Sequence, residues 1–288
     1  MTALTFKQSL ASLPTLAPAH ELYYRCERAD GYSLKVYWQT LKERHHDLNA
    51  LDYLCYSDDR LVGMLNIFFF SDIAEICVLV DPEFRHQGIF KKLLMIGLTK
   101  LRNYIVHEYM FIVNDKFEKF AEECVKRNAV IDHKEVEMRP RPNISYESKQ
   151  KITLTRATLE DLDILADLHI QSFEKPDFDS IKERFATTLR EPNRKAYLAR
   201  NEQGEVVGKI HAREDFNRIV VHDVGIAKKF REQGYGKALM LTWLKEYSRE
   251  YAKPIVVEVF SDNTAALKLY ENCGFEYTNK YTFYKFPL

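Results

Sequence analysis

The fold of this chain is decided by a stretch that occurs twice, as Val80-Asp-Pro-Glu-Phe-Arg85-His-Gln87-Gly88-Ile-Phe90-Lys91-Lys-Leu-Leu94 and as Ile226-Ala-Lys-Lys-Phe-Arg231-Glu-Gln233-Gly234-Tyr-Gly236-Lys237-Ala-Leu-Met240. Arg231 follows Arg85 by 146 residues, about half of the 288-residue chain. Self-similarity at a fixed offset is typical of an internal repeat. We therefore predict two related domains, each of an ordinary domain's length.

The boundary between these domains is predicted in the segment Met138–Lys151. It contains two X-Pro steps, Arg139-Pro140 and Arg141-Pro142, followed by a polar stretch. Such a composition favours an extended linker and disfavours a helix. We place the boundary near residue 145, which gives predicted domains of residues 1–145 and 146–288.

The second half shows the fuller series of elements. Strands are predicted at 151–156, 196–200, 205–213, 219–226, 254–260 and 277–286, and helices at 158–173, 179–189, 236–251 and 263–272. The first half repeats the later part of this series, with strands at 53–56, 61–70, 73–80 and 109–113 and helices at 90–104 and 117–128. This order predicts an α+β (mixed α/β) fold on a partly parallel sheet.

Composition excludes several classes of protein. Lys+Arg and Asp+Glu balance at 42 each, which argues against a general attraction to nucleic acid or to an anionic membrane. The longest apolar run, Ile67–Phe70, is far too short to cross a bilayer, so no membrane insertion is expected. Residues Met1–His20 lack a continuous apolar core, so they do not resemble a secretory signal.

The cysteines give no sign of a metal site or of a disulfide framework. Five of them are scattered along the chain without a CxxC motif or a Cys/His cluster: Cys26, Cys55, Cys77, Cys124 and Cys273. We expect no metal, and we expect reduced, mostly buried thiols in a cytoplasmic protein.

The repeated stretch has the chemistry of a phosphate cradle. A strand runs into Arg-x-x-Gly-x-Gly and then into a helix, so backbone N–H groups and the positive end of the helix dipole converge on one point. Arg231 and Lys237 add positive charge. A single copy would be explained as well by an ordinary strand-to-helix turn, but two copies at a fixed offset make that explanation poor.

A second element follows in the C-terminal half. Glu258 is the one charged residue among Ile255, Val256, Val257, Val259 and Phe260. A buried, unpaired carboxylate costs several kcal/mol, so this residue requires an explanation. It is a catalytic carboxylate, a member of a buried ion pair, or a residue on a solvent-facing sheet edge. His222, on the strand before the loop, is the second candidate for a catalytic base.

The residues that follow Glu258 complete a known signature. Arg231-x-x-Gly234-x-Gly236, then Asn263-x-x-Ala266-x-x-x-Tyr270-x-x-x-Gly274-Phe275, resembles the GCN5-related N-acetyltransferase (GNAT) superfamily, and the first half resembles it in its loop. The resemblance implies two tandem GNAT domains, each a central, mixed, splayed β-sheet flanked by helices. It also implies direct transfer of acetyl from acetyl-CoA to a primary amine.

Within this family, the stretch from Glu258 to Tyr270 resembles ribosomal-protein N-terminal acetyltransferases. That resemblance implies that Glu258 is the general base and that Tyr270 protonates the departing thiolate. The acetyl-CoA-binding residues it implies are Val224, Ile226, Arg231, Glu232, Gln233, Gly234, Tyr235, Gly236, Lys237 and Asn263, with Val78, Val80, Arg85, His86, Gln87, Gly88, Ile89 and Phe90 as their counterparts in the first half.

The first half departs from the pattern where chemistry is expected. Phe90 replaces the last glycine of the loop, and Ile112 stands at the position of Glu258. The position of Tyr270 is taken by Cys124 or Val125, depending on a one-residue shift. We therefore expect a degenerate domain that is able to bind acyl-CoA but not to catalyse transfer.

The sequence thus predicts an N-acetyltransferase with its chemistry in the C-terminal domain. The acceptor is a primary amine of a protein N-terminus, a lysine or a small molecule, with Tyr281 and Tyr284 as possible lining residues. The alternative is a non-catalytic, acyl-CoA-responsive binding or scaffold protein. The tandem layout also resembles VipF-like secreted bacterial effectors, which implies delivery into a host cytosol in place of a cytoplasmic location in the producing cell.

Overall fold

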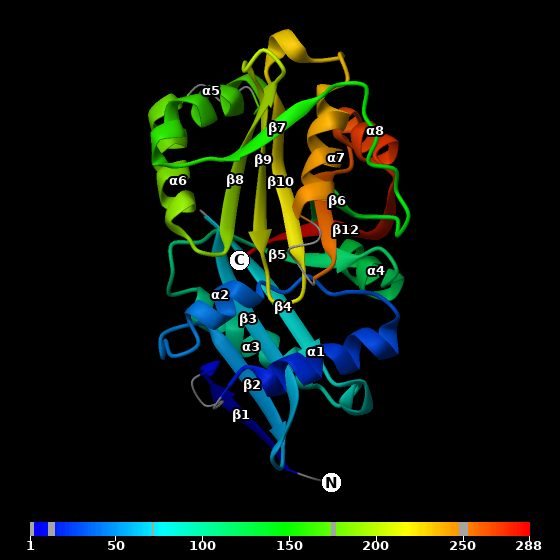
Figure 1. Ribbon diagram of the computed structural model, residues 1–288. Coiled ribbons are helices and arrows are strands. Elements are labelled where there is room, and N and C mark those ends of the chain that lie inside the picture. Colours follow the sequence, from blue (N-terminus) through cyan, green and yellow to red (C-terminus); the bar gives the residue numbers. More distant parts are fainter. Residues whose placement is uncertain (1–2, 11–14, 71, 174–176, 248–252) are drawn as a thin grey trace. The chain divides into compact units, whose positions relative to one another are not determined.

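The chain forms two compact units in a computed structural model that describes residues 3–10, 15–70, 72–173, 177–247 and 253–288 (Figure 1). One unit comprises Met1–Lys134 together with Asn279–Leu288, and the other comprises Glu135–Thr278. We call them the N-terminal unit and the C-terminal unit.

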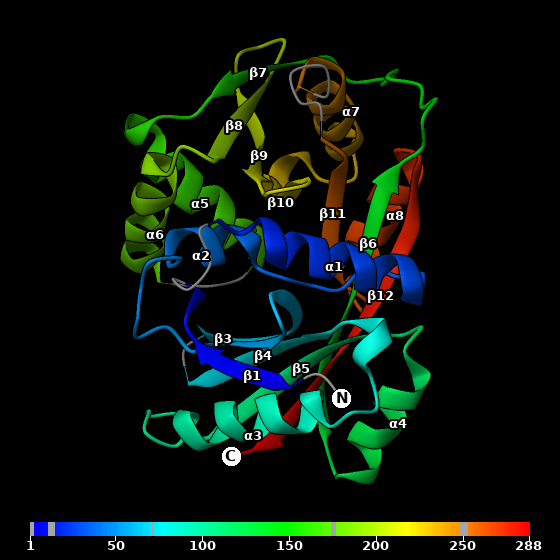
Figure 2. The same ribbon diagram turned by 90° about the horizontal axis from the view of Figure 1, so that it is seen from below.

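The N-terminal unit is built on a sheet in the order β1-β2-β3-β4-β5-β12. Its strands are β1 (Leu4–Gln8), β2 (Asp52–Ser57), β3 (Arg60–Phe70), β4 (Ile73–Val80), β5 (Glu108–Asn114) and the later part of β12 (Phe275–Pro287), and its helices are α1 (Ala17–Asp30), α2 (Trp38–Glu43), α3 (Ile89–Leu101) and α4 (Glu118–Lys126). β4 and β5 are parallel, whereas β5 and β12 are antiparallel. Helices α1 and α2 cover one face and α3 and α4 the other (Figure 2).

The C-terminal unit repeats this plan in the order β6-β11-β10-β9-β8-β7. Its strands are the later part of β6 (Val130–Pro140), β7 (Ile152–Arg156), β8 (Arg194–Asn201), β9 (Val206–Glu214), β10 (Ile219–Ile226) and β11 (Ile255–Phe260), and its helices are α5 (Leu162–Phe173), α6 (Phe178–Arg190), α7 (Tyr235–Tyr247) and α8 (Thr264–Asn272). β10 and β11 are parallel. α5 and α6 pack on one face of this sheet and α7 with α8 on the other (Figure 2).

Local sequence signals account for several element ends. Thr158 and Asp161 form the capping box that opens the 3-10 turn leading into α5. Asn263 caps α8 by accepting a hydrogen bond from the Ala266 N–H at 3.1 Å. Gly274 follows α8 with a φ of 83°, the left-handed conformation that glycine adopts without strain. The sequence predicts each of these three features for the same reason that the structure shows, which is a capping box, an N-cap and a left-handed residue after a helix, respectively.

The predicted α+β fold with two tandem domains is confirmed, but several elements differ from expectation. Strand β1 and helices α1 and α2 have no counterpart among the predicted elements. The helix predicted at 236–251 is α7, which ends at Tyr247 as described, and residues 248–251 lie outside the described part of the chain. The segment predicted as a linker begins inside β6, which continues through Pro140.

Strands β6 and β12, which we call the closing strands, explain why the compact units do not coincide with the two halves of the sequence. Residues 281–287 of β12 pair with β5 in the N-terminal unit, from Tyr281↔Asn114 to Pro287↔Glu108. Residues 135–138 of β6 pair with β11 in the C-terminal unit. Each half of the sequence therefore supplies the last strand of the other unit. A boundary near residue 145 stays a prediction about where the two repeats meet in sequence.

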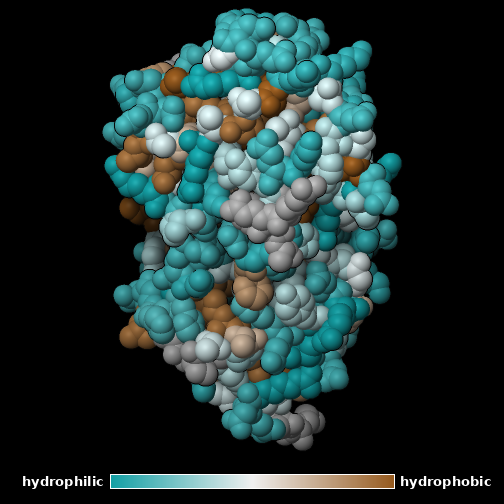
Figure 3. Space-filling model, viewed as in Figure 1, coloured by the Kyte–Doolittle hydropathy of each residue, from teal (hydrophilic) through white to brown (hydrophobic). Residues whose placement is uncertain are grey.

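The hydropathy of the surface varies from place to place. On the face shown in Figure 3, hydrophilic side chains predominate and hydrophobic ones gather in smaller patches. Among the described residues, no helix is long and apolar enough to cross a membrane.

Replacing Phe286 with Ala should destabilise the N-terminal unit, although Phe286 lies near the end of the sequence. Its side chain is 6% exposed and stacks on Tyr109 of β5 with ring centroids 5.1 Å apart. Removing a buried Phe side chain costs about 3–5 kcal/mol. Hydrogen exchange followed by mass spectrometry should therefore accelerate in β5 and α4 more than in β8 and β9.

The matched control is Phe178→Ala in α6, because Phe178 is 36% exposed. Its exchange pattern should stay close to that of the wild type. Faster exchange confined to β8 and β9 in Phe286→Ala would contradict the assignment of the closing strand.

Candidate active site

The two repeated loops have the same backbone conformation. In the N-terminal unit a 3-10 turn (Pro82–Phe84) leads to left-handed residues His86 (φ 64°) and Gly88 (φ 81°) before α3 begins. In the C-terminal unit the turn Lys228–Phe230 leads to Glu232 (φ 59°) and Gly234 (φ 90°) before α7. Alternation of right- and left-handed residues makes backbone N–H groups converge, and a helix N-terminus follows directly. Both loops therefore have the geometry of an anion cradle.

The arginine of each loop is held by its own unit. The Arg231 Nε–H donates to the carbonyl of Ile226 at 3.1 Å, and the Arg85 Nε–H donates to the carbonyl of Val80 at 3.2 Å. Arg231 also donates to the carbonyl of Gln171, while Arg85 makes a two-point ion pair with Asp30 at 2.6 and 2.8 Å. These guanidinium groups fasten each loop to the end of the preceding strand, so the cradle is formed mainly by backbone groups.

Phe90 changes the N-terminal loop less than its size suggests. Its ring packs on Phe120 of α4 and Phe111 of β5, with centroids 5.6 and 6.3 Å away. At the matching position, a Cβ on Gly236 would lie 3.3 Å from Leu269 Cδ1 of α8. The aromatic side chain thus fills space between helix and sheet, where the C-terminal unit has Leu269 close to its glycine.

A fork lies beside each loop. In the C-terminal unit the parallel pairing of β10 and β11 ends at Val221↔Val257, and in the N-terminal unit that of β4 and β5 ends at Ile76↔Phe111. Beyond these pairs the strands separate. Val224 and Ile226, like Val78 and Val80, lie on the separated segment that leads into the loop.

The C-terminal unit adds a bulge at its fork. The register of β10 with β9 shifts between His222 and Gly225, and Asp223 in the bulge has a left-handed φ of 51°. A Cβ on Gly225 would clash with Ser172 Oγ of α5, so this glycine allows the helix to approach the bulge. In the N-terminal unit the described residues of β3 and β4 pair from Phe70↔Ile73 to Gly63↔Val80 without such a shift.

The bulge directs Asp223 into a buried polar cluster. Its carboxylate pairs with Lys209 of β9, whose side chain is 0% exposed, and lies 3.0 Å from His169 Nδ1 of α5. Arg184 of α6 donates to His169 Nε2 at 3.0 Å, so the proton of this imidazole is on Nδ1, from which it donates to Asp223. Asp223 is therefore held from both β9 and α5.

Burial and pairing shift these groups in opposite ways. Burial lowers the pKa of Lys209 to about 8, against the raising effect of the Asp223 carboxylate. Burial would raise the pKa of Asp223, but Lys209 and the His169 hydrogen bond hold it well below its usual range. At neutral pH the pair is ionised, which a buried site tolerates only when both charges are present.

Ionisable side chains also meet at the fork itself. His222 pairs with His211 of β9, and both lie on the face covered by α5 and α6, as Lys209 does. Burial, reinforced by Arg213, lowers the pKa of His222 to about 3, so its imidazole is neutral. The Nε2 atoms of His211 and His222 are buried and make no hydrogen bond within the described part of the chain.

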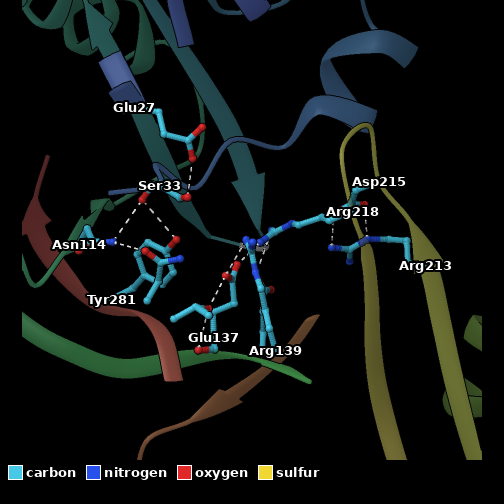
Figure 4. Close-up of polar contacts among 12 residues, drawn as sticks. Glu27, Ser33, Asn114, Glu137, Arg139, Arg213, Asp215, Arg218 and Tyr281 are labelled. Atoms are coloured by element: carbon cyan, nitrogen blue, oxygen red, sulfur yellow. Dashed lines mark hydrogen bonds and ion pairs between the residues drawn. The ribbon is translucent and has the colours of Figure 1, made fainter. Parts of the chain in front are cut away.

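Glu258 lies on β11 one residue beyond the last parallel pair. Its Oε1 is 2.9 Å from Nη2 of Arg218, and its side chain is 16% exposed. Of the explanations for this lone charge, the structure supports an ion pair, which leaves a catalytic role open. Figure 4 shows Arg218 between Asp215, which pairs with Arg213, and Glu137.

Tyr270 projects from α8 into the core of the C-terminal unit. Its residue is 6% exposed, and its ring lies 5.6 Å from that of Phe275. Burial, with a smaller effect of Cys273, raises the pKa of Tyr270, so the hydroxyl keeps its proton at neutral pH.

Comparison with known proteins agrees with the repeated loops and forks. The model of the acetyltransferase (GNAT) family matches residues 16–124 and 162–275. The chain belongs to this family. Mycothiol acetyltransferases of Renibacterium salmoninarum and Streptomyces griseus are 34% identical over 96 and 85 residues, which are 31% and 28% of this chain and only 28% and 27% of those proteins.

Solved structures show the same tandem fold. A GCN5-related N-acetyltransferase from Sphaerobacter thermophilus superposes with a TM-score of 0.74 at 16% identity, over 99% of this chain and 95% of its own. A tandem GNAT protein from the clavulanic acid biosynthesis pathway gives 0.71 at 14% identity, over 99% and 98%. The closer resemblances to ribosomal-protein acetyltransferases and to VipF-like effectors stay predictions.

The N-terminal GNAT unit has the loop and the fork, but Ile112 and Cys124 stand at the positions of Glu258 and Tyr270. Ile112 faces Phe283 across the β5–β12 ladder, in an apolar cluster with Met110 and Tyr281. Cys124 is buried, and burial raises its pKa to about 11, so it stays a neutral thiol. Tyr281 and Tyr284 are buried in this unit as well.

Sequence reasoning did not single out Lys209, His169, Arg218 or Glu137. Lys209 stands between Gly208 and Ile210 and shares its face of the strand with His211 and Arg213, a pattern that also fits a half-exposed strand. The available signal was that β9 lies inside the sheet, where a polar residue facing a helix must find a partner. Among the described residues, no group of three or more His, Cys, Asp or Glu side chains is arranged to hold a metal ion.

Asp223→Asn should destabilise the chain by about 3–5 kcal/mol at pH 7, because it leaves the Lys209 ammonium buried without a counter-charge. Lys209→Met combined with Asp223→Asn should lose less than the sum of the single losses. Urea unfolding of the four proteins in a double-mutant cycle gives the coupling.

The coupling should depend on pH in a defined direction. It requires charged Lys209, so it should be largest at low pH, where Asp223 is still ionised, and should be lost as the pH rises through the folded-state pKa of about 8. A coupling that is the same at pH 6.5 and pH 9.5 would contradict the ionised pair.

Proposed function

We propose that the chain is an acetyl-CoA-dependent N-acetyltransferase in which the C-terminal unit transfers acetyl directly to a primary amine. The observation that carries this proposal is the coincidence of a cradle loop, a fork with a bulge, and Glu258 and Tyr270 in one unit. In the described residues of the N-terminal unit, Ile112 and Cys124 stand where those two side chains are expected. The family match supports acetyl-CoA as the cosubstrate.

The loop and the separated strand bind acetyl-CoA. The N–H groups of Gln233 to Gly236 and the α7 dipole receive the pyrophosphate, with Lys237 adding charge. The main chain of Val224–Ile226, free of β11 beyond the fork, pairs with the pantetheine arm. The bulge fixes this segment because Asp223 is anchored on its other side.

The reaction needs a neutral amine and a stabilised thiolate. Glu258 takes a proton from the incoming ammonium, the nitrogen attacks the thioester carbonyl, and the C–S bond breaks. The departing thiolate takes a proton from the Tyr270 hydroxyl, which its raised pKa keeps protonated until then. The acetylated nitrogen loses its second proton, which restores the Tyr270 hydroxyl, and Glu258 releases its proton to solvent. His222 is the second candidate base, but burial lowers its pKa to about 3, so its imidazole is a poor proton acceptor at neutral pH.

The acceptor we favour is a protein or peptide α-amine, with lysines and small amines as further candidates. Holding a lysine neutral at pH 7 costs about 4.6 kcal/mol, whereas an α-amine costs about 1 kcal/mol. A single carboxylate manages the smaller cost more readily. The name of the curated relatives adds small molecules of the mycothiol class to the acceptors worth screening.

Tyr270→Phe should lower kcat by about 100-fold or more while leaving acetyl-CoA affinity nearly unchanged. The assay is release of free CoA thiol from acetyl-CoA with a pool of short peptides and small amines, beside calorimetry with acetyl-CoA. A collapse of affinity would make Tyr270 a structural residue. Tight binding without turnover on any amine would favour the alternative, a non-catalytic acyl-CoA-responsive scaffold.

Gly234→Asp should abolish both tight acetyl-CoA binding and turnover, because it sets a carboxylate against the pyrophosphate. Gly88→Asp should remove a second, weaker site in the N-terminal unit and leave most turnover intact. Calorimetry and the thiol assay measure the two effects.

The control for backbone strain is Gly204→Asp. Gly204 has a φ of 80°, and, as at Gly88, an added Cβ meets nothing within 4 Å. It lies in the β8–β9 turn, so it should change stability but not binding. Loss of turnover in a folded Gly88→Asp protein would mean that the N-terminal unit takes part in catalysis.

A further inference from the structure

Two carboxylates face each other beside the fork of the C-terminal unit. Glu137 of β6 is the register partner of Glu258 of β11 in their antiparallel ladder. Side chains directly opposite in such a ladder have Cβ atoms about 4.5–5.5 Å apart, and like charges there destabilise the sheet. Glu137 is 0% exposed, so water does not screen it. This pair needs a cation between its members.

Arg218 is that cation. Its Nη1 lies 2.5 Å from Glu137 Oε2 and its Nη2 lies 2.9 Å from Glu258 Oε1, so one guanidinium is shared by both carboxylates. The other oxygen of Glu137 accepts from Thr278 Oγ1 at 2.8 Å and from Arg139 Nη2 at 3.2 Å. Glu137 is therefore held on both oxygens, and it shares the Arg218 guanidinium with Glu258.

Further charged and titratable groups near this pair lie on β6, on β9, on β10 and in the turn between β9 and β10. Asp215 Oδ2 lies 3.8 Å from Arg218 Nε, and Asp215 also accepts from Arg213 of β9. His222 follows Val221, the register partner of Val257, so it lies on the same face of the sheet as Glu258. Near Glu258 the groups are thus Glu137, Arg139, Arg213, Asp215, Arg218 and His222, of which three are basic guanidinium groups.

The N-terminal unit provides an internal comparison. The positions 146 residues away from Glu137 and Glu258 are Phe283 and Ile112, and these two are also register partners. The position matching Arg218 is Asp72. The same ladder therefore forms with an apolar pair and without the arginine. Strand pairing does not require the carboxylates, so their presence beside the candidate base has another cause.

We infer that Glu137 is a positioning residue for Glu258, and that the N-terminal half of the sequence supplies it. Glu137 orients Arg218 and shares its charge. Arg218 in turn holds Glu258 toward the fork. Because Arg218 also pairs with Glu137, its positive charge is shared between the two carboxylates. The inference rests on the proposed function, in which Glu258 is the base. It adds that the C-terminal half of the sequence does not contain a complete active site.

The test is the titration of the Glu258 carboxyl in the full chain, followed by ¹³C NMR of labelled glutamate and assigned with Glu258→Gln. Glu137→Gln removes the competing carboxylate, so Arg218 acts on Glu258 alone and the titration midpoint should fall by about one pH unit. Arg218→Gln leaves two facing carboxylates, so the midpoint should rise by about one unit or more. A merely structural role would not produce shifts of opposite sign.

The matched control is Glu276→Gln. Glu276 is an exposed carboxylate of the same unit that pairs with Arg141 at 3.4 Å, and it should not move the midpoint. The acidic limb of kcat/KM, measured with acetyl-CoA and the peptide pool, should shift in the same directions as the titration. Thermal melting identifies any variant that does not fold, and if Glu137→Gln does not, Glu137→Asp replaces it, because the shorter side chain draws the carboxylate away from Arg218 and should also lower the midpoint.

Unchanged midpoints, or shifts of the same sign in both variants, would overturn the inference. Opposite shifts in titration without any wild-type turnover would leave the coupling established and would refute the proposed function instead. Opposite shifts in titration with an unmoved kcat/KM limb would show that Glu137 tunes Glu258 but that Glu258 is not the base, which overturns the positioning role.

Discussion

The Lys209–Asp223 ion pair is the constraint on which the C-terminal site depends. Asp223 adopts a left-handed backbone, a conformation that costs a non-glycine residue about 1–2 kcal/mol. The ion pair with Lys209 and the hydrogen bond from His169 offset this cost. They do so only because both charges are buried together. The N-terminal unit forms its fork without a bulge, so the anchored Asp223 does not create the C-terminal fork but fixes the path of β10 beyond it. Arg231 of the loop donates to the carbonyl of Ile226, three residues after Asp223, so the position of the loop depends on the bulge.

The sequence predicted most of the fold because its signals were local. Loop glycines, the Thr158 capping box, Asn263 and Gly274 each follow from the conformation of a few neighbouring residues. The exchange of closing strands was not predictable in this way. Pro140 and Pro142 indicated a linker, yet Met138 pairs with Val257, a partner more than a hundred residues away. Proline is tolerated at the end of a strand, so its presence did not exclude β6.

The candidate site was predictable only where a residue broke its local pattern. Glu258 stood out as a single charge in an apolar strand. Lys209 and Glu137 did not, because each alternates with apolar neighbours as the solvent face of an ordinary strand does. Their burial results from helices α5 and α6 and from the closing strand, which no local pattern encodes. The ion pair of Glu258 was among the open explanations, but its partner Arg218 lies forty residues away.

The closing strands also give a physical reason for keeping a domain with Ile112 and Cys124 at the positions of Glu258 and Tyr270. Without residues 135–138, β11 would become a sheet edge with unpaired backbone groups beside Val256, Val257 and Val259, an arrangement prone to aggregation. Without residues 281–287, β5 would be exposed in the same way. A chain that exchanges these strands cannot discard either half and keep both sets of strand pairings. Because β6 also brings Glu137 to the fork, the requirement that preserves the N-terminal half is chemical as well as structural.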